Sequence, residues 1–297
     1  MPPFVQDIVH RIWPVMILIV AIASFQVGAS LGKSLFPSIG PSGVTTLRLL
    51  VAAILLLAVL RPWRKPITIA DWPIIFGYGA ALGMMNLLYY TSLQTIPQGI
   101  AVALEFTGPL SVALLCSRRR GDLAWVCLAI LGIVMLLTLG PHDSGPIDPW
   151  GVVCALGAGA CWAGYILFGQ RAGNRHGTSA VALGMAIAAL VVTPIGIWEA
   201  GSALLSWDIL PLALGVAVLS AAIPYALEMY TLPRLSAPAF GTLMSLEPAA
   251  AALSALLLLG QELVLLQWMA IGLVVLASLG VTLSGPATSH QLSTELH

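Results

Sequence analysis

The chain has 297 residues, of which 59% are hydrophobic and 8% are charged, and its formal net charge is zero. Soluble domains carry about 25% charged residues, so this composition excludes a water-soluble fold of this size. The charge balance also provides no basic face for nucleic acid. The lipid bilayer is therefore the expected environment, and no nucleic-acid partner is expected.

Apolar stretches of about twenty residues, enough to cross a hydrocarbon core of about 30 Å, predict an all-α polytopic membrane protein. Gly, Pro and charged residues divide the chain into about ten candidate transmembrane helices. In chain order they are 13–32, 42–60, 72–91, 98–117, 123–140, 150–169, 179–198, 209–230, 238–259 and 264–284. The first stretch is longer than a signal-peptide core of about 7–15 residues, so we expect a helix there rather than a signal peptide.

The basic residues lie in short gaps between these stretches and predict the topology. Cytoplasmic loops collect Lys and Arg, and ten of the twelve basic residues fall at the start of the chain or in alternate gaps. They are Arg11, Arg61, Arg64, Lys65, Arg118, Arg119, Arg120, Arg171, Arg175 and Arg234. We expect a cytoplasmic N-terminus and cytoplasmic gaps at 61–71, 118–122, 170–178 and 231–237. The C-terminal tail carries no Lys or Arg, and helix parity alone predicts that it is cytoplasmic.

Two halves of the chain, residues 12–140 and 150–285, resemble one another. The segment Ala21–Gly28 is similar to Ala158–Tyr165, and Ile96–Glu105 is similar to Ala237–Glu247 with a slip of one residue. An offset of about 140 residues spans five helices, and because five is odd, the second half enters the membrane upside down. Inverted repeats of this kind place a substrate site near the midplane. The sequence thus predicts two inverted five-helix repeats.

Ionisable residues within the apolar stretches need a partner or a wet cavity, because a charge in hydrocarbon costs several kcal/mol. Glu105 and Glu247 are expected near the middle of the fourth and ninth helices, and Arg48 near the middle of the second. Each glutamate either carries a proton or a substrate ammonium, or serves as a fixed partner for Arg48 or for helix-end amides. Arg48 is either an ion-pairing strut or a carboxylate anchor. Lys33 and Glu228 lie near helix ends, where they can snorkel to the interface.

Uncharged polar residues inside the helices are the next candidates for substrate contacts. Amides are unfavourable on a lipid-facing surface, so Gln26 and Asn86 are expected to face inward, either toward a substrate or in interhelical hydrogen bonds. Tyr89 and Tyr165 have the same two interpretations. Trp162, at a helix centre, either walls a cavity or simply packs.

Several kinds of chemistry find no support in the sequence. The five histidines all lie in predicted loops or tails, so no intramembrane zinc site or Ser-His hydrolase can form. The string Gly28–Ser34 lacks the first glycine of a phosphate-binding loop and does not follow a strand. We therefore expect no metal, no cofactor and no enzymatic activity.

Four segments, Ser24–Pro37, Gln94–Leu110, Ala155–Leu167 and Gly241–Pro248, identify a family. They resemble the EamA branch of the drug/metabolite transporter superfamily and, within it, the threonine/homoserine exporters of the bacterial inner membrane. The resemblance extends over about residues 11–285. It implies secondary active efflux of small neutral amino acids by exchange with protons.

The resemblance and the buried charges together lead to one hypothesis. A zwitterion needs both charges matched, so Glu105 is expected to take the ammonium or the proton, and Arg48 or Lys33 the carboxylate. Gln26, Asn86, Tyr89 and Tyr165 are expected to contact its hydroxyl or amide groups. Two alternatives stay open, namely export of other small metabolites and passive facilitation without a titrating gate.

Overall fold

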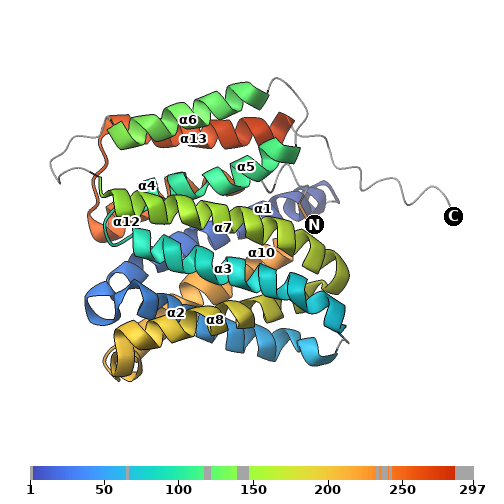
Figure 1. Ribbon diagram of the computed structural model, residues 1–297. Coiled ribbons are helices and arrows are strands. Elements are labelled where there is room, and N and C mark those ends of the chain that lie inside the picture. Colours follow the sequence, from blue (N-terminus) through green and yellow to red (C-terminus); the bar gives the residue numbers. More distant parts are fainter. Residues whose placement is uncertain are drawn as a thin grey trace.

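The structure is a computed structural model that describes residues 3–64, 67–116, 122–138, 147–231, 234–235, 240 and 243–284. Within these residues the regular elements are all helices, which run side by side along one common direction (Figure 1). The expected all-α class is therefore confirmed.

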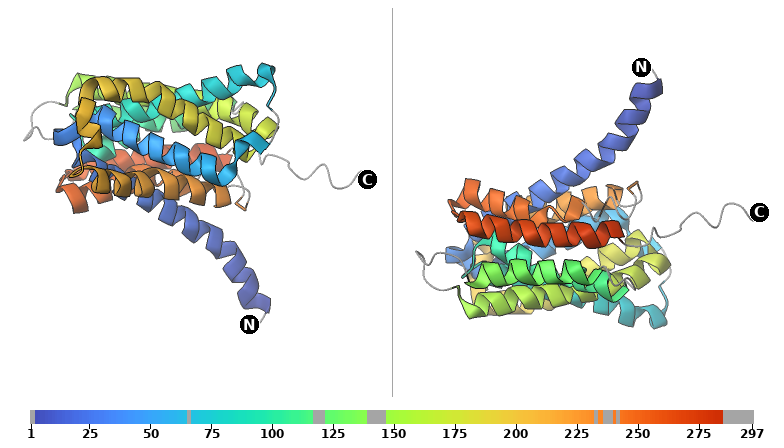
Figure 2. Two further views of the ribbon diagram at one scale, coloured as in Figure 1. Left: turned by 90° about the horizontal axis from the view of Figure 1, so that it is seen from below. Right: turned by 90° about the horizontal axis from the view of Figure 1, so that it is seen from above.

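The described residues of the first part of the chain form six helices and two short 3₁₀ turns. The helices are α1 (Pro3–Lys33), α2 (Phe36–Leu60), α3 (Trp72–Ser92), α4 (Gln98–Glu105), α5 (Thr107–Cys116) and α6 (Asp122–Thr138). The 3₁₀ turns η1 (Pro62–Arg64) and η2 (Ile69–Asp71) lie between α2 and α3. The first turns of α1 extend away from the other helices (Figure 2).

The second part has a similar series of helices. They are α7 (Pro149–His176), α8 (Thr178–Ala200), α9 (Leu210–Ala217), α10 (Ile223–Thr231), α12 (Glu247–Leu259) and α13 (Leu265–Ser284). A 3₁₀ turn η3 (Gly201–Leu205) follows α8, and a π-helical turn η4 (Val218–Ala222) joins α9 to α10. Among the described residues, five segments are long and apolar enough to cross a membrane: Ile12–Lys33, Phe36–Arg64, Pro149–His176, Thr178–Leu205 and Leu210–Glu228.

The continuous helix expected over 98–117 is broken, and this corrects the position of Glu105. The residue lies at the end of α4, and Phe106 separates it from α5. Pro109 explains the break, because a proline has no N–H for the carbonyl four residues before it and its ring clashes with that carbonyl. The carbonyl concerned is that of Glu105.

Glu247 also lies at a helix end rather than near the middle of a continuous helix. It is the first residue of α12, directly after a turn at Ser245–Leu246. Pro248 disfavours helical hydrogen bonding back to Met244, and it suits the first turn of a new helix. Glu105 and Glu247 therefore both lie at helix breaks, within four residues of a proline.

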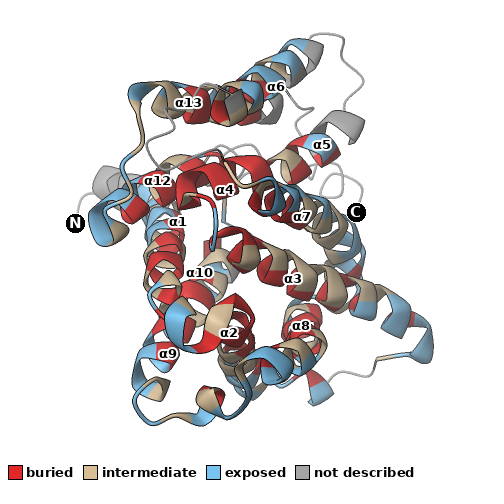
Figure 3. Ribbon diagram, turned by 60° about the vertical axis from the view of Figure 1, so that its left-hand side comes forward, coloured by how far each residue is buried: buried red, intermediate tan, exposed pale blue. Residues whose placement is uncertain are grey.

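The surface of the bundle fits a bilayer. Large apolar side chains are exposed along the helices, among them Val59, Leu190 and Leu257. Buried residues lie mainly on the sides where helices face one another (Figure 3). Exposed tryptophans gather at the helix ends, with Trp63 beside α2 and Trp198 near the end of α8. Aromatic side chains prefer the membrane–water interface, so this distribution supports a multi-pass membrane protein.

Most helix pairs join one part of the chain to the other. The largest contacts are α3 with α7, α2 with α8, and α6 with α13. Further pairs are α1 with α10, α1 with α12, α3 with α8, α4 with α12, and α4 and α5 with α7. The pair α6–α13 forms one side of the bundle, next to α4 and α5 (Figure 1).

Some expectations fall on residues that the structure does not describe. These are the positions Lys65 and Arg118 to Arg120 of the predicted cytoplasmic gaps, the predicted helix start at 238, the ends of the two halves at 139–140 and 285, and the C-terminal tail.

Glycines allow the helices near Glu105 to approach closely. Gly108 of α5 faces the carbonyl of Gly159 on α7, and a Cβ atom at Gly159 would lie 2.7 Å from the carbonyl oxygen of Glu105. That oxygen belongs to the backbone, so it cannot move aside easily. The close crossing of α5 and α7 therefore depends on glycine at both positions.

We expect Gly159→Ala to destabilise the protein by about 1–3 kcal/mol, the usual cost of overpacking a well-packed site. Gly173→Ala in the same helix is the matched control, because no atom lies within 4 Å of its added Cβ. Thermal unfolding of the detergent-purified proteins checks this difference. Equal midpoints for the two variants would contradict the tight crossing.

Candidate functional site

Arg48 is fully buried in the middle of the bundle, on α2. Its Nη2 donates a hydrogen bond of 3.0 Å to the carbonyl of Ser220. The guanidinium carbon also lies 4.9 Å from the ring centres of both Phe25 and Tyr90. A desolvated cation is stabilised by aromatic faces at this distance, so three helical segments hold the side chain in one orientation.

The acceptor for Arg48 comes from the π-helical turn η4. In such a turn the backbone hydrogen bonds run to the fifth residue rather than the fourth, which changes the direction of its carbonyls. The hydroxyl of Ser24 donates to the carbonyl of Leu219 at 2.7 Å, next to the Arg48–Ser220 bond. Gly28 lets α1 approach, since a Cβ there would lie 2.6 Å from the backbone nitrogen of Ser220. Side chains from α1 and α2 thus satisfy adjacent carbonyls of the turn.

Several buried donors on α1, α2 and α3, two of them on Arg48, have no hydrogen-bond partner within the described residues. They are Nε and Nη1 of Arg48, the hydroxyls of Tyr89 and Tyr90, and Nε2 of Gln26. An unsatisfied buried polar group costs about 1–3 kcal/mol. All four residues come from α1, α2 and α3, and Tyr89 packs edge-on against Tyr90 with ring centres 5.5 Å apart. The arrangement can receive a group that supplies several acceptor oxygens.

Glu105 supplies the opposite charge. Its residue is only 7% exposed, and its carboxylate makes no hydrogen bond or ion pair with any described residue. The charge of Arg48 acts on it, and both charges act on the Tyr89 hydroxyl. The next residue, Phe106, packs edge-on against Trp162 with ring centres 5.1 Å apart. Glu105 can therefore accept from a cationic group beside an aromatic wall.

Glu247 is as deeply buried as Glu105, at 7% exposure. It lies within electrostatic range of Glu105 and of Glu228 on α10. The two helix breaks thus bring the expected pair of glutamates into one region of the protein, and neither forms an ion pair with Arg48.

Tyr165 and Asn86 belong to a neighbouring group of polar side chains. Tyr165 stacks on Tyr78 with ring centres 4.9 Å apart, and their hydroxyls are 3.5 Å apart. Asn86 donates to the carbonyl of Leu82 in its own helix at 2.8 Å and interacts with Tyr225. These side chains already have partners, unlike Tyr89 and Tyr90.

Lys33 and Gln26, both expected to contact the substrate, differ in how deeply they are buried. Lys33 is the last residue of α1, is partly buried and forms no ion pair with a described residue. Gln26 is 1% exposed, and its side-chain oxygen accepts from Gln98 at 3.1 Å. Of the two cations proposed for a carboxylate, Arg48 alone is fully enclosed beside the unpartnered donors.

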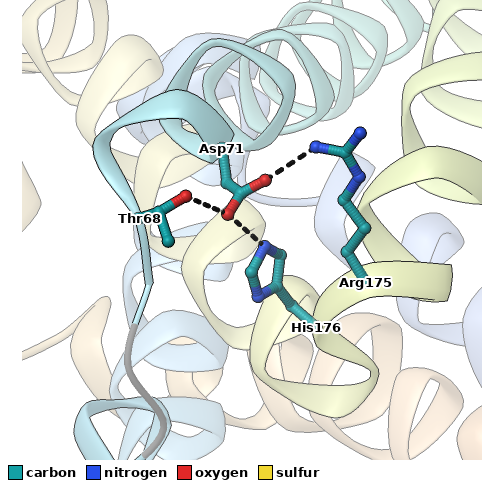
Figure 4. A network of polar contacts seen from close by, with 4 residues as sticks. All are labelled: Thr68, Asp71, Arg175 and His176. Carbon is teal, nitrogen blue, oxygen red and sulfur yellow. Dashed lines mark hydrogen bonds and ion pairs between the residues drawn. The ribbon is translucent and has the colours of Figure 1, made fainter.

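A separate polar cluster ties α3 to α7 at one end of the bundle (Figure 4). The carboxylate of Asp71 accepts from the Thr68 hydroxyl and from Nη1 of Arg175 at 2.8 Å. Nε2 of His176 lies 3.2 Å from the same carboxylate and forms an ion pair when the imidazole is protonated. The side chain of Asp71 is 11% exposed, whereas that of Arg175 is 59% exposed.

The sequence analysis missed several members of these clusters. In the sequence, Phe25 and Ser220 look like ordinary apolar and small helix residues, and neither periodicity nor charge distinguishes them from their neighbours. Gln98 follows Pro97 at a predicted helix start, where an amide is usually solvated. A signal did exist for the helix break, because Pro109 stands four residues after Glu105.

Comparison with known proteins agrees with this architecture. The model of the EamA-like transporter family matches residues 149–283. The threonine/homoserine exporter RhtA of Escherichia coli K12 is 54% identical over 275 residues, which cover 92% of each chain. The chain belongs to the EamA-like transporter family. The resemblance expected from the four sequence segments is confirmed.

More distant relatives share the same plan. An uncharacterised inner membrane transporter of Escherichia coli K12, YedA, is 32% identical over 268 residues, covering 85% of this chain and 84% of its own. A solved crystal structure shares the fold with a TM-score of 0.62 at 21% identity, covering 92% of this chain and 97% of that chain. The family consists of transporters rather than enzymes, in line with the sequence analysis.

The Asp71 cluster should stabilise the fold in a pH-dependent way. The Thr68 hydroxyl, followed by the Arg175 guanidinium, holds the pKa of Asp71 below its ordinary value of 3.8. A carboxyl with a lowered pKa stabilises the folded state above its unfolded pKa, and this contribution is lost as the pH falls through the folded pKa.

We expect Asp71→Asn to lower the thermal midpoint at pH 7 by only a few degrees, because partly solvated ion pairs contribute little. The difference from the unsubstituted protein should shrink as the pH falls below about 4. Thermal unfolding in detergent between neutral and acid pH checks this. Asp208→Asn is the control, since the exposed Asp208 has no hydrogen bond or ion pair among the described residues. A difference that stays constant down to the acid limit would contradict the assignment.

Proposed function

We propose that the protein exports small neutral amino acids, among them threonine and homoserine, from the cytoplasm in exchange for protons. The observation that carries the proposal is the group of unpartnered buried donors on Arg48, Tyr89, Tyr90 and Gln26, of which Arg48 and Tyr89 lie within electrostatic range of Glu105. The name of the 54% identical relative, a threonine/homoserine exporter, supports the substrate class.

An amino-acid zwitterion fits the chemistry of these groups. Moving its two charges out of water is costly unless both are paired and hydrogen-bonded. Its carboxylate offers acceptor oxygens to Arg48 and to the tyrosine hydroxyls. Its ammonium offers donors to Glu105, which has no partner of its own within the described residues. A substrate without ionised groups would leave both charges unmatched.

The roles of the remaining residues follow from their positions. Arg48 takes the substrate carboxylate in this proposal, and Lys33, at the end of α1 opposite to the cytoplasmic N-terminus, lies on the side where the exported substrate leaves. Trp162 forms an aromatic wall beside the helix break at Phe106. Tyr165 and Asn86 line the neighbouring polar group, and Glu247 is a second proton acceptor at the other helix break.

Coupling arises if the substrate ammonium and a proton compete for Glu105. The site then changes sides only when one of the two occupies the carboxylate. Each proton that enters down the membrane potential supplies about 2.3 kcal/mol per 100 mV. At about 1.4 kcal/mol per factor of ten, one proton sustains a roughly forty-fold substrate gradient at that potential, before any contribution from the pH difference.

The proposed architecture consists of two inverted five-helix repeats, residues 12–140 and 150–285, with both termini in the cytoplasm of a bacterial inner membrane. The helix pairs support it. In this architecture each helix has an equivalent in the other repeat: α1, α2, α3, α4/α5 and α6 correspond to α7, α8, α9/α10, α12 and α13. Replacing every helix by its equivalent turns the pair α3–α7 into α1–α10. It also turns α4–α7 into α1–α12, and leaves α2–α8, α4–α12 and α6–α13 unchanged, and all these pairs are observed.

The test of this function is the flux of radiolabelled threonine and homoserine in membrane vesicles, with and without an imposed pH gradient. We expect a gradient that is acid on the side opposite to the substrate to accelerate flux. Flux that ignores the gradient would identify a passive facilitator instead. Absence of flux for both amino acids would point to another small metabolite.

We expect Glu105→Gln to abolish flux driven by the pH gradient, because the amide cannot exchange a proton. Glu199→Gln serves as the control, since Glu199 is exposed and accepts a hydrogen bond from the Ser42 hydroxyl away from the site. The amount of each variant in the membrane is measured by immunoblotting. Normal proton-driven flux by Glu105→Gln would remove this residue from the coupling.

Arg48→Lys should raise the KM for threonine by about ten-fold or more, although the charge is kept. An ammonium cannot stack between two rings while donating in a planar fork, and a lost charged hydrogen bond costs about 1.5–3 kcal/mol. Vesicle uptake at several threonine concentrations gives the KM. Lys33→Arg is the comparison, and a larger effect at Lys33 than at Arg48 would reverse the assignment of the carboxylate anchor.

A further inference from the structure

A fully buried knot of amide and hydroxyl groups lies where α1, α4 and α12 meet. It consists of Gln26 and Ser30 from α1, Gln98 from α4 and Ser254 from α12, and these four residues are at most 7% exposed. The proposed function has used only Gln26 from this group. The other three need an explanation, because polar groups in the interior are retained only at the cost of desolvation.

Gln98 is the centre of the knot. Its Oε1 accepts from the Ser30 hydroxyl at 2.8 Å, and its Nε2 donates to both the carbonyl and the side-chain oxygen of Gln26 at 3.1 Å. The Ser254 hydroxyl lies 3.4 Å from the same Nε2. The backbone N–H of Gln98 donates to Oε1 of Gln261 at 3.1 Å. Both ends of the Gln98 amide therefore have partners, and its orientation is fixed.

This orientation also fixes the amide of Gln26. Because Oε1 of Gln26 faces the Nε2 donor of Gln98, Nε2 of Gln26 must point in another direction. Turning the Gln26 amide over would place two donors against each other. Nε2 of Gln26 has no partner within the described residues although it is fully enclosed. The two oxygens of Gln26 thus accept from Gln98, and Nε2 of Gln26 is left as a donor without a partner.

Two relations in the chain connect the free donor to the proposed substrate site. Phe25, the neighbour of Gln26 in α1, has its ring against the Arg48 guanidinium. Glu105 is seven residues after Gln98, and residues two turns apart lie on the same face of a helix. The side of α4 that forms the knot is therefore also the side that carries the Glu105 carboxylate.

We propose that Gln98 is a positioning residue, which holds the Gln26 amide so that its Nε2 donates to an oxygen of the bound amino acid. This inference rests on the proposed function, since it requires an amino-acid substrate. The oxygen belongs to the substrate carboxylate or to the hydroxyl of threonine and homoserine. In either case Gln98 acts through Gln26 and does not itself touch the substrate.

A double-mutant cycle tests the proposal. Gln26→Met, Gln98→Met and the double variant are compared in vesicles, with KM and maximal rate measured for radiolabelled threonine. We expect each single variant to raise KM about ten-fold with little change in maximal rate. The double variant should be no worse than either single variant, because both remove the same contact. Effects that multiply in the double variant, or an unchanged KM for Gln98→Met, would overturn the proposal.

Two further variants separate positioning from mere loss of structure. Ser254→Ala removes a hydroxyl that lies 3.4 Å from Nε2 of Gln98 but keeps the Ser30 and Gln26 hydrogen bonds that orient the Gln98 amide, so it should lower the thermal midpoint but leave KM unchanged. If Gln98→Met fails to reach the membrane, Gln98→Glu replaces it in the cycle. Its second carboxylate oxygen attracts Nε2 of Gln26 into the knot, and the same rise in KM is expected. A normal KM for Gln98→Glu would overturn the proposal.

The choice of substrate distinguishes the two oxygens. If the carboxylate is the acceptor, Gln98→Met raises KM equally for threonine and for 2-aminobutyrate, which lacks the hydroxyl. If the hydroxyl is the acceptor, KM rises for threonine alone. Failure of the proposed function would be visible separately, because the unsubstituted protein would then show no amino-acid flux in the same vesicles.

Discussion

The cost of enclosing a guanidinium in a low-dielectric interior determines how the middle of this protein is built. Arg48 cannot be neutralised, so the fold must surround it with groups that stabilise a cation. Two aromatic rings and one backbone carbonyl do so. That carbonyl is available because the helix between α9 and α10 includes a π-helical turn, and α1 reaches the turn because Gly28 has no side chain. The irregular backbone and the small residue are thus consequences of one buried charge.

The helix breaks at Glu105 and Glu247 also reflect the cost of unsatisfied polar groups in hydrocarbon. A backbone in hydrocarbon must satisfy its own hydrogen bonds, and an interrupted helix is tolerated only inside the protein or beside water. Pro109 and Pro248 each withdraw a hydrogen bond within one turn of a buried carboxylate. The freed backbone groups and the acid therefore lie together, and polar chemistry is concentrated at two places in otherwise apolar helices.

Much of the fold could be predicted from the sequence, because helix length and hydropathy in a membrane follow directly from bilayer thickness. The positions of α1, α2, α3, α7, α8 and α13 correspond to apolar stretches that charges or turn residues delimit. Arg48 and Glu105 could be singled out because a charge in such a stretch always needs a reason. What the sequence could not supply was the pairing between distant side chains. Gln98, Phe25 and Ser220 gain their importance only from the residues placed against them in three dimensions.

The same limit applies to the charged residues outside the membrane. Asp71, Arg175 and His176 lie in predicted loops, where solvation is the ordinary expectation, and 104 residues separate Asp71 from Arg175. Their contact depends on the way α3 packs along α7, which periodicity does not reveal. The helix break at Phe106 is a different case, since its proline was visible and only the assumption of a continuous helix concealed it.

The exchange of helix partners between the two parts of the chain has a consequence for biogenesis. The principal neighbours of α2, α3 and α6 are α8, α7 and α13, all of which are synthesised later. The early helices are therefore inserted before these partners exist, and Arg48 lacks its Ser220 acceptor until the second part of the chain emerges from the ribosome. Assembly of the interior is then a late, cooperative event, and a truncated product that stops after α6 would have hydrophilic groups with nothing to cover them.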